Sequence, residues 1–315
     1  MMSRQSATVR SALEWTALIL FLAAPIGSSV LFGGVKLWMS GPFILVTCAA
    51  SLLLLTLKFL YREPIFRFPP AWFGLLAICA YTLYSISGAT VPYEARLEFV
   101  KWCALLLTYW GLTELLSTGH RWKIVLGTFL VAGSMLAWYA IIQHSRESNL
   151  VLNTPRPEMY KMRASATFIC PNHFAYLVEL YLIMGVALIP MRVAGIALRL
   201  IGGYTALLAL PVLLLTQSRS AWIGAVAGLG ILLLLLAGRR SLGRMFVAGL
   251  LFGLAILLLA VSLWSFSATF QHRVREATHG NMRTQVWTDT LDMIEDEPVT
   301  GHGPGSYRWM YPRYK

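Results

Sequence analysis

Residues 199–237 read RLIGGYTALLALPVLLLTQSRSAWIGAVAGLGILLLLLA. Two apolar runs, 199–216 and 220–237, are separated by almost no loop, because the polar stretch Thr216–Ser220 overlaps their ends. As helices, such runs are long enough to cross about 30 Å of hydrocarbon. We therefore expect a transmembrane helical hairpin with Arg219 at its tip.

Similar apolar runs recur along the chain. At the length that a bilayer requires, they predict about nine spans, at 13–32, 42–57, 70–87, 99–116, 122–142, 171–190, 199–216, 220–237 and 245–267. The runs are continuous and not alternating, which favours helices over the strands of a membrane barrel. The sequence thus predicts an all-α fold, a polytopic transmembrane helix bundle that forms one transmembrane domain over residues 1–315.

Composition supports the same class. The 315 residues are 57% hydrophobic and 13% charged, whereas a soluble domain carries about 25% charged residues. The four cysteines form no CxxC pair and no disulfide framework, and three of them lie in apolar runs. No motif calls for a metal or another cofactor. The first apolar run is too long for a signal peptide, so we expect an uncleaved span.

The net charge of +12 would suggest nucleic acid in a soluble protein. Here most Lys and Arg fall in short loops, as the positive-inside rule expects, and no nucleic-acid partner is predicted. With a cytoplasmic N-terminus, the inner loops hold Arg4, Arg10, Lys58, Arg62, Arg67, Arg121, Lys123, Arg192, Arg199, Arg239, Arg240 and Arg244. The short outer loops hold Lys36, Arg96 and Arg219. This bias predicts a multi-pass protein with its N-terminus in the cytoplasm.

Two segments are longer than the other connections, residues 143–170 and 268–315, and both fall on the outer side in this topology. Long loops translocate regardless of their charge, and loops carry function more often than the spans that position them. We expect the chemistry in these two outer loops. The second is expected to be incomplete at Lys315.

Arg219 lies between Ser218 and Ser220 at the expected membrane boundary. A planar guanidinium can bind an anionic headgroup bidentately, through two parallel N–H···O hydrogen bonds. The small side chains beside Arg219 let a ligand approach closely. The alternative is an Arg that only reaches toward lipid headgroups.

The segment from Arg163 to Ala175 precedes and enters a span. Pro171 suits the first turn of a helix, and Asn172 and His173 follow where free N–H groups attract anions. His173 is more often structural than catalytic in such a place. Glu179 lies about two turns inside the span, where a carboxylate is a functional candidate or the partner of a neighbouring Arg.

The stretch from Asn281 to Pro298 predicts a short amphipathic helix on the membrane surface, with apolar positions at Val286, Leu291 and Ile294. Arg283 lies near its beginning. The glycines of GHGPGSY, residues 301–307, follow no strand and precede no GK[ST], so a tight turn is a better account than a nucleotide loop.

Three motifs together resemble the O-antigen ligase and O-antigen polymerase superfamily of bacterial polysaccharide assembly. They are R-x-S-x-T-F…P-N-H-F-A at 163–175, S-R-S at 218–220 and R-x-x-x-W…P…G-x-G-x-G at 283–305. The resemblance covers residues 120–312. Ala166 stands where the pattern has glycine.

The resemblance implies a metal-independent glycosyltransferase of the bacterial inner (cytoplasmic) membrane. Its donor would be a polyprenyl-diphosphate-linked glycan and its acceptor a glycan or a lipid, with membrane lipids around it. Arg219 and Arg283 match the catalytic positions that hold the diphosphate, and Arg163, Asn172, His173, Glu179, Ser218 and Ser220 are expected to line the substrate site. The base that activates the acceptor is expected beyond Lys315.

Two charged side chains at a partly dehydrated interface can stabilise a leaving diphosphate without a metal ion. The sequence leaves ligase and polymerase as alternatives, together with the sugar, the acceptor and the linkage. A transporter or flippase of lipid-linked saccharides predicts several ionisable groups within spans, and only Glu179 and Glu114 fit that pattern. An inactive membrane scaffold is the remaining alternative.

Overall fold

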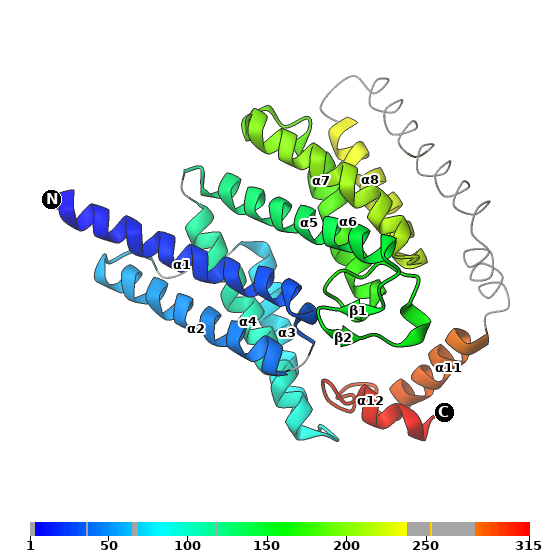
Figure 1. Cartoon of the computed structure of the whole chain (residues 1–315). Helices are drawn as coiled ribbons and strands as arrows, with labels where there is room; N and C mark the ends of the chain where they lie inside the picture. Colours follow the sequence, from blue (N-terminus) through cyan, green and yellow to red (C-terminus); the bar gives the residue numbers. More distant parts are fainter. Residues whose placement is uncertain (1–3, 36, 65–68, 118, 238–252, 254–280) are drawn as a thin grey trace. The chain divides into compact units, whose positions relative to one another are not determined.

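Helices make up most of the computed structural model, which describes residues 4–35, 37–64, 69–117, 119–237, 253 and 281–315. The main helices are α1 (Arg4–Val30), α2 (Leu37–Leu60), α3 (Pro70–Ser85), α4 (Pro92–Leu116), α5 (Arg121–Ser145), α6 (Pro171–Leu188), α7 (Ile196–Leu215), α8 (Arg219–Ala237) and α11 (Asn281–Asp296) (Figure 1). Short elements are η1 (Phe32–Gly34), β1 (Leu150–Val151), β2 (Thr154–Pro155), η2 (Glu158–Tyr160), η3 (Arg192–Ala194), α12 (Tyr307–Met310) and η4 (Tyr311–Arg313).

Seven helices of the described chain are long and apolar enough to cross a membrane, namely α1, α2, α4, α5, α6, α7 and α8. An eighth, α3, is apolar but has 16 residues. These helices coincide with eight of the expected spans, and the ninth, 245–267, lies outside the described residues. The predicted class, an all-α polytopic membrane protein, is confirmed.

The chain divides into two compact units. Unit 1 comprises Met1–Ala24, Gly41–Thr118 and Val274–Lys315, and unit 2 comprises Pro25–Ser40 and Gly119–Arg273. Both units contain membrane-spanning helices, and the single transmembrane domain stays a prediction.

Unit 2 is built around α6, which packs against α7 and α8, while α7 also packs against α5 (Figure 1). Its core includes Phe174, Leu182 and Val212, all fully buried. Small residues allow the helices to approach closely, as is common in membranes. A Cβ built on Gly185 of α6 would lie 2.4 Å from the carbonyl oxygen of Gly202 in α7, so the two backbones are in direct contact there.

Helices α6 and α8 run parallel. The Tyr176 hydroxyl of α6 lies 3.1 Å from that of Ser220 in α8. Farther along, Gly228 of α8 accommodates Ile183, because a Cβ there would lie 2.4 Å from that side chain. The N-termini of both helices therefore lie at the same end of unit 2.

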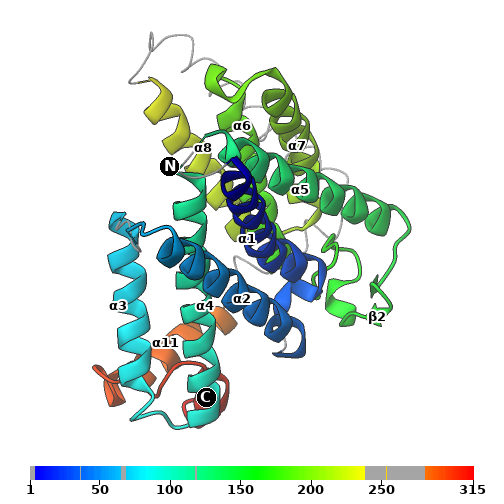
Figure 2. The same cartoon turned by 90° about the vertical axis from the view of Figure 1, so that its left-hand side faces the viewer.

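Unit 1 contains α3 and α4, which pack side by side, with the C-terminal segment at the end where they are connected (Figure 2). The backbone N–H of Thr90 in the connection donates to the carbonyl oxygen of His302 at 3.0 Å. The Tyr81 hydroxyl of α3 donates to the carbonyl oxygen of Val299 at 2.9 Å. The C-terminal segment is therefore attached to the end of the α3–α4 hairpin.

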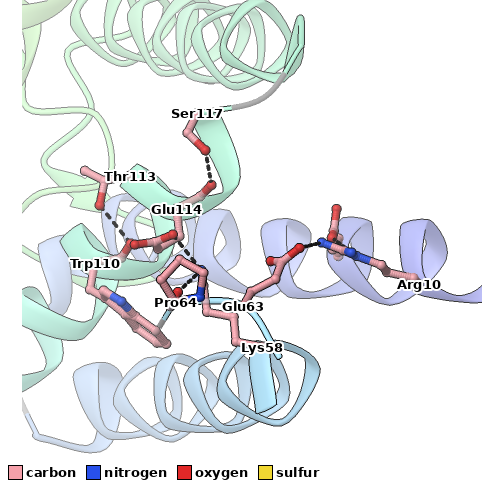
Figure 3. A network of polar contacts seen from close by, with 9 residues as sticks. Arg10, Lys58, Glu63, Pro64, Trp110, Thr113, Glu114 and Ser117 are labelled. Atoms are coloured by element: carbon pink, nitrogen blue, oxygen red, sulfur yellow. Dashed lines mark hydrogen bonds and ion pairs between the residues drawn. The ribbon is translucent and has the colours of Figure 1, made fainter. Parts of the chain in front are cut away.

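A buried ion pair lies at the other end of this unit (Figure 3). The Lys58 ammonium of α2 is 2.7 Å from a Glu114 carboxylate oxygen of α4, and their side chains are 7% and 2% exposed. Lys58 also donates to the carbonyl oxygen of Pro64 at 2.9 Å. Nearby, Arg10 is paired with both Glu14 and Glu63. This pairing gives Glu114 a structural role that the sequence did not indicate.

Candidate functional site in unit 2

The 143–170 loop is attached to its own bundle by an amide side chain at the end of α5. The Gln143 Nε2 group donates to the carbonyl oxygens of Leu150 at 2.9 Å and Ala166 at 3.2 Å. Its Oε1 atom accepts from the N–H of Ser165 at 3.2 Å. One buried side chain therefore joins the beginning and the end of the loop.

A buried guanidinium organises the interior of the loop. Arg156 is 4% exposed. It donates to the carbonyl oxygens of Arg163 at 2.8 Å and Ser148 at 3.0 Å, and to the Ser165 hydroxyl at 2.7 Å. No carboxylate is among these partners, and its Nε atom has no partner. Burial lowers the pKa of Arg156 from its ordinary value, but an Arg keeps its charge in proteins. The loop thus contains an uncompensated positive charge.

Arg163 joins the loop to the C-terminal end of α7. This side chain is 6% exposed, and its Nε atom donates to the carbonyl oxygen of Thr216 at 2.8 Å. A second nitrogen donates to the Asn172 Oδ1 atom. The backbone N–H of Ala164 also donates to the carbonyl oxygen of Leu215 at 3.0 Å. The last carbonyls of a helix lack intrahelical donors and carry partial negative charge, so a cation there is well placed.

The S-R-S motif begins α8 directly after a tight turn. Thr216 and Ser218 are buried, and Gln217 between them has a φ of 52°. The Ser218 N–H donates to the Thr216 hydroxyl at 3.3 Å, and the Ser218 and Ser220 hydroxyls lie 3.4 Å apart. The turn is therefore closed by small hydroxyl side chains.

Arg219 occupies the first position of α8 and is half-buried. Its side chain makes no hydrogen bond or ion pair with the part of the chain that the structure describes, in contrast to those of Arg156 and Arg163. The N-termini of α6 and α8 lie at this end, and each helix start adds about half a positive charge. Positive potential thus accumulates around a guanidinium whose donors bind none of the described residues.

The start of α6 is as the sequence predicts. Pro171 is its first residue, Asn172 is half-buried and His173 is exposed. The Asn172 Oδ1 atom accepts from Arg163, so Asn172 supports the loop. No described residue hydrogen-bonds the His173 ring.

Glu179 lies one turn deeper than Tyr176 on α6 and packs against α8. A Cβ built on Gly224 would lie 2.4 Å from its Oε1 atom, so glycine provides the space for this carboxylate. Among the described residues it has no Arg or Lys within ion-pair distance. The alternative in which a neighbouring Arg pairs with Glu179 is therefore not observed in this part of the chain.

Arg283 lies in unit 1, in the first turn of α11. The predicted amphipathic helix is confirmed as α11, but Trp287 and not Val286 completes its exposed apolar side. The GxGxG segment is a turn, with φ of 57°, 91° and 74° at Gly301, Gly303 and Gly305. Arg219 and Arg283 lie in different units, and their convergence on one ligand stays a prediction.

Sequence reasoning missed Gln143 and Arg156. Gln143 follows an apolar run and Arg156 lies between Pro155 and Pro157. An Arg flanked by prolines in a long loop is a weak signal of a fixed local structure. Within the described residues, no group of three or more His, Cys, Asp or Glu side chains is arranged to hold a metal ion.

The fold and the loop together define a polytopic helical membrane protein with a cationic site at the ends of its spans. Residues 204–315 match the family model described as O-antigen ligase. This confirms the resemblance to the O-antigen ligase and polymerase superfamily, and the matched region includes Arg219, Arg283 and the glycine turn. No curated protein and no solved structure gives a significant match.

Proposed function

We propose that this protein transfers or polymerises a polyprenyl-diphosphate-linked glycan at the outer face of the bacterial inner membrane, with its N-terminus in the cytoplasm. The matched O-antigen ligase domain supports a membrane glycosyltransferase of the ligase or polymerase type in general. The observation that carries the finer proposal is Arg219, a guanidinium with no described partner beside two helix N-termini.

The charges of the site favour a diphosphate. Arg156 and Arg163 are fixed by main-chain and side-chain oxygens of the loop and of α7. None of the hydrogen-bond partners of Arg156 is a carboxylate, so its positive charge favours an anion near the loop. The donors of Arg219 bind no residue that the structure describes, and they form a planar fork that matches two phosphate oxygens. In this proposal Arg219 binds the ligand, and Arg156 and Arg163 position the loop around it.

The reaction follows from this placement. The acceptor hydroxyl attacks the anomeric carbon, the bond from that carbon to the diphosphate breaks, and the electron pair leaves with the diphosphate. Negative charge grows on the leaving group, where Arg219 stabilises it together with Arg283. The acceptor proton passes to a base that none of the described residues supplies in this proposal.

The test is glycan transfer in membranes with a polyprenyl-diphosphate donor. Arg219→Ala and Arg283→Ala should each lower the rate about a hundredfold or more, because losing one charge-stabilising donor costs about 2.7–4 kcal/mol of barrier. Arg219→Lys should recover part of the loss. The matched control is Arg146→Ala, since Arg146 is an exposed residue at the start of the same loop.

Equal expression and monodispersity in detergent are checked for each variant. Parental rates in both Arg219→Ala and Arg283→Ala would exclude the diphosphate role. Donor crossing the bilayer with no glycan joined to an acceptor would indicate a transporter instead. A ladder of product lengths identifies a polymerase, and transfer of one preformed chain identifies a ligase.

A further inference from the structure

Helix α11 carries an exposed apolar stripe. Trp287, Leu291 and Ile294 are 68%, 59% and 52% exposed. Their spacing of four and three residues puts them on one face of the helix. Large apolar side chains gathered on one exposed face mark an interaction surface, whereas isolated ones do not.

The opposite side of α11 is packed against the C-terminal segment. Asp289 and Met293 are each 8% exposed. The Tyr311 hydroxyl donates to Asp289 at 3.0 Å, and the His302 Nε2 atom lies 3.2 Å from the carbonyl oxygen of Met293. The helix therefore buries a carboxylate and exposes a tryptophan, the reverse of the arrangement that water favours.

The attachment of this segment places the stripe near the ends of two spans. Gly303 contacts the α3–α4 connection so closely that a Cβ would lie 2.4 Å from the Cβ of Ala89. Gly305 lies against α4, where a Cβ would be 3.2 Å from that of Glu94. With the Tyr81–Val299 bond, these contacts hold the segment where α3 ends and α4 begins.

Exposed aromatic side chains surround the same end of unit 1. They are Tyr81, Tyr84, Tyr93, Tyr307 and Trp309, with exposed fractions from 44% to 62%. Tyr and Trp gather at the boundary between hydrocarbon and water, where an apolar ring and a polar atom are both satisfied. Tyr81 and Tyr84 lie on α3, whose other exposed side chains include Phe73, Leu76 and Ile78, so the aromatic group indicates the bilayer as the occupant of the stripe.

We infer that α11 lies at the boundary between the inner membrane and the water on its outer side, with Trp287, Leu291 and Ile294 inserted among the lipid chains. The other exposed side chains of α11 include Asp292, Glu295 and Asp296, which carry negative charge. Anionic lipids do not attract such a helix, so apolar burial drives the insertion. The contact should therefore persist in zwitterionic lipid and at high salt.

The experiment uses the whole chain in phosphatidylcholine nanodiscs at one protein per disc. The four native cysteines are changed to alanine, and a nitroxide is attached through Leu291→Cys or Ile294→Cys. Matched controls are Asp292→Cys and Glu295→Cys on the same helix. Relaxation by oxygen, which concentrates in lipid, is compared with relaxation by a water-soluble nickel chelate.

The ratio of relaxation by oxygen to relaxation by the chelate should be at least threefold higher at Leu291→Cys and Ile294→Cys than at the two control positions. The same difference should persist in 0.5 M salt, where the Debye length is about 4 Å. Equal accessibility at all four positions would overturn the inference. Protection that appears only when several copies share a membrane would also overturn it, in favour of a second copy of the chain.

A second measurement avoids the cysteine changes. Phosphatidylcholine brominated in its acyl chains quenches the fluorescence of nearby tryptophans. The contribution of Trp287, taken as the difference in emission between the parent and Trp287→Phe, should be quenched strongly. An unquenched Trp287 contribution would refute the insertion.

Discussion

Replacing Arg163 with alanine should open the 143–170 loop without unfolding the bundle. The side chain donates to the carbonyl oxygen of Thr216 at 2.8 Å and to Asn172, and it is 6% exposed. Solvent screening is small at such burial. Each hydrogen bond from a charged donor contributes about 1.5–3 kcal/mol, so two bonds contribute at least about 3 kcal/mol to the closed loop.

That free energy sets the size of the measured effect. About 3 kcal/mol corresponds to a change of more than a hundredfold in an equilibrium constant. Hydrogen exchange reads the opening directly, because the amides of Ala164 and Ser165 are bonded to Leu215 and Gln143 in the closed loop. Their exchange in Arg163→Ala should accelerate by about that factor, while amides within α6 change little.

Arg146→Ala is the control, because Arg146 is exposed in the same loop. Its exchange should stay within about threefold of the parent, as for most surface changes of less than about 0.5 kcal/mol. The exchange rates in Arg163→Lys should fall between those in Arg163→Ala and Arg146→Ala, since one ammonium group cannot reproduce the planar, forked set of donors of a guanidinium. If Arg163→Ala exchanges at the parental rate, the bonds of Arg163 do not hold the loop.

Two further predictions concern unit 1. Gly303→Ala should detach the glycine turn from the α3–α4 connection, because the new Cβ would overlap Ala89. A Cβ at Gly301 would have nothing within 4 Å, so Gly301→Ala should lower the free energy of unfolding by only about 1–2 kcal/mol because of its positive φ. Limited proteolysis of the C-terminal segment should distinguish the two variants, and equal protection would contradict the close contact. Lys58→Met should lower the free energy of unfolding by about 3–5 kcal/mol, because it removes the cation that faces the buried Glu114 carboxylate, and adding Glu114→Leu should restore much of it. Thermal unfolding in detergent measures both variants, and a double variant that recovers no stability would contradict the pairing.

The spans were predictable because length and apolar content decide whether a segment crosses a membrane. Pro171 marked the start of α6, and the short polar stretch at 216–220 marked the hairpin. Ala166 is instructive too, because its φ of 47° lies in the left-handed region that favours glycine, the residue that the resemblance implies at this position.

The interior of the 143–170 loop was not predictable in the same way. The sequence identifies Arg163 as a cation but does not say whether its donors bind main-chain oxygens or a ligand. That depends on which carbonyls are left free where α7 ends, a property of the folded chain. The same holds for Lys58 and Glu114, which are 56 residues apart in sequence and meet only after α2 and α4 pack.

The contact between Gly185 and Gly202 has a consequence for how substrate preference can change. Helices whose main chains touch cannot shift along one another, or admit a larger side chain, without separating. The scaffold beneath the cationic site is thus a fixed frame, and under the proposed function we expect any difference in sugar or acceptor preference to arise in the surface segments at the helix ends. Exchanging residues 143–162 between related proteins, with α6 and α7 retained, tests this expectation.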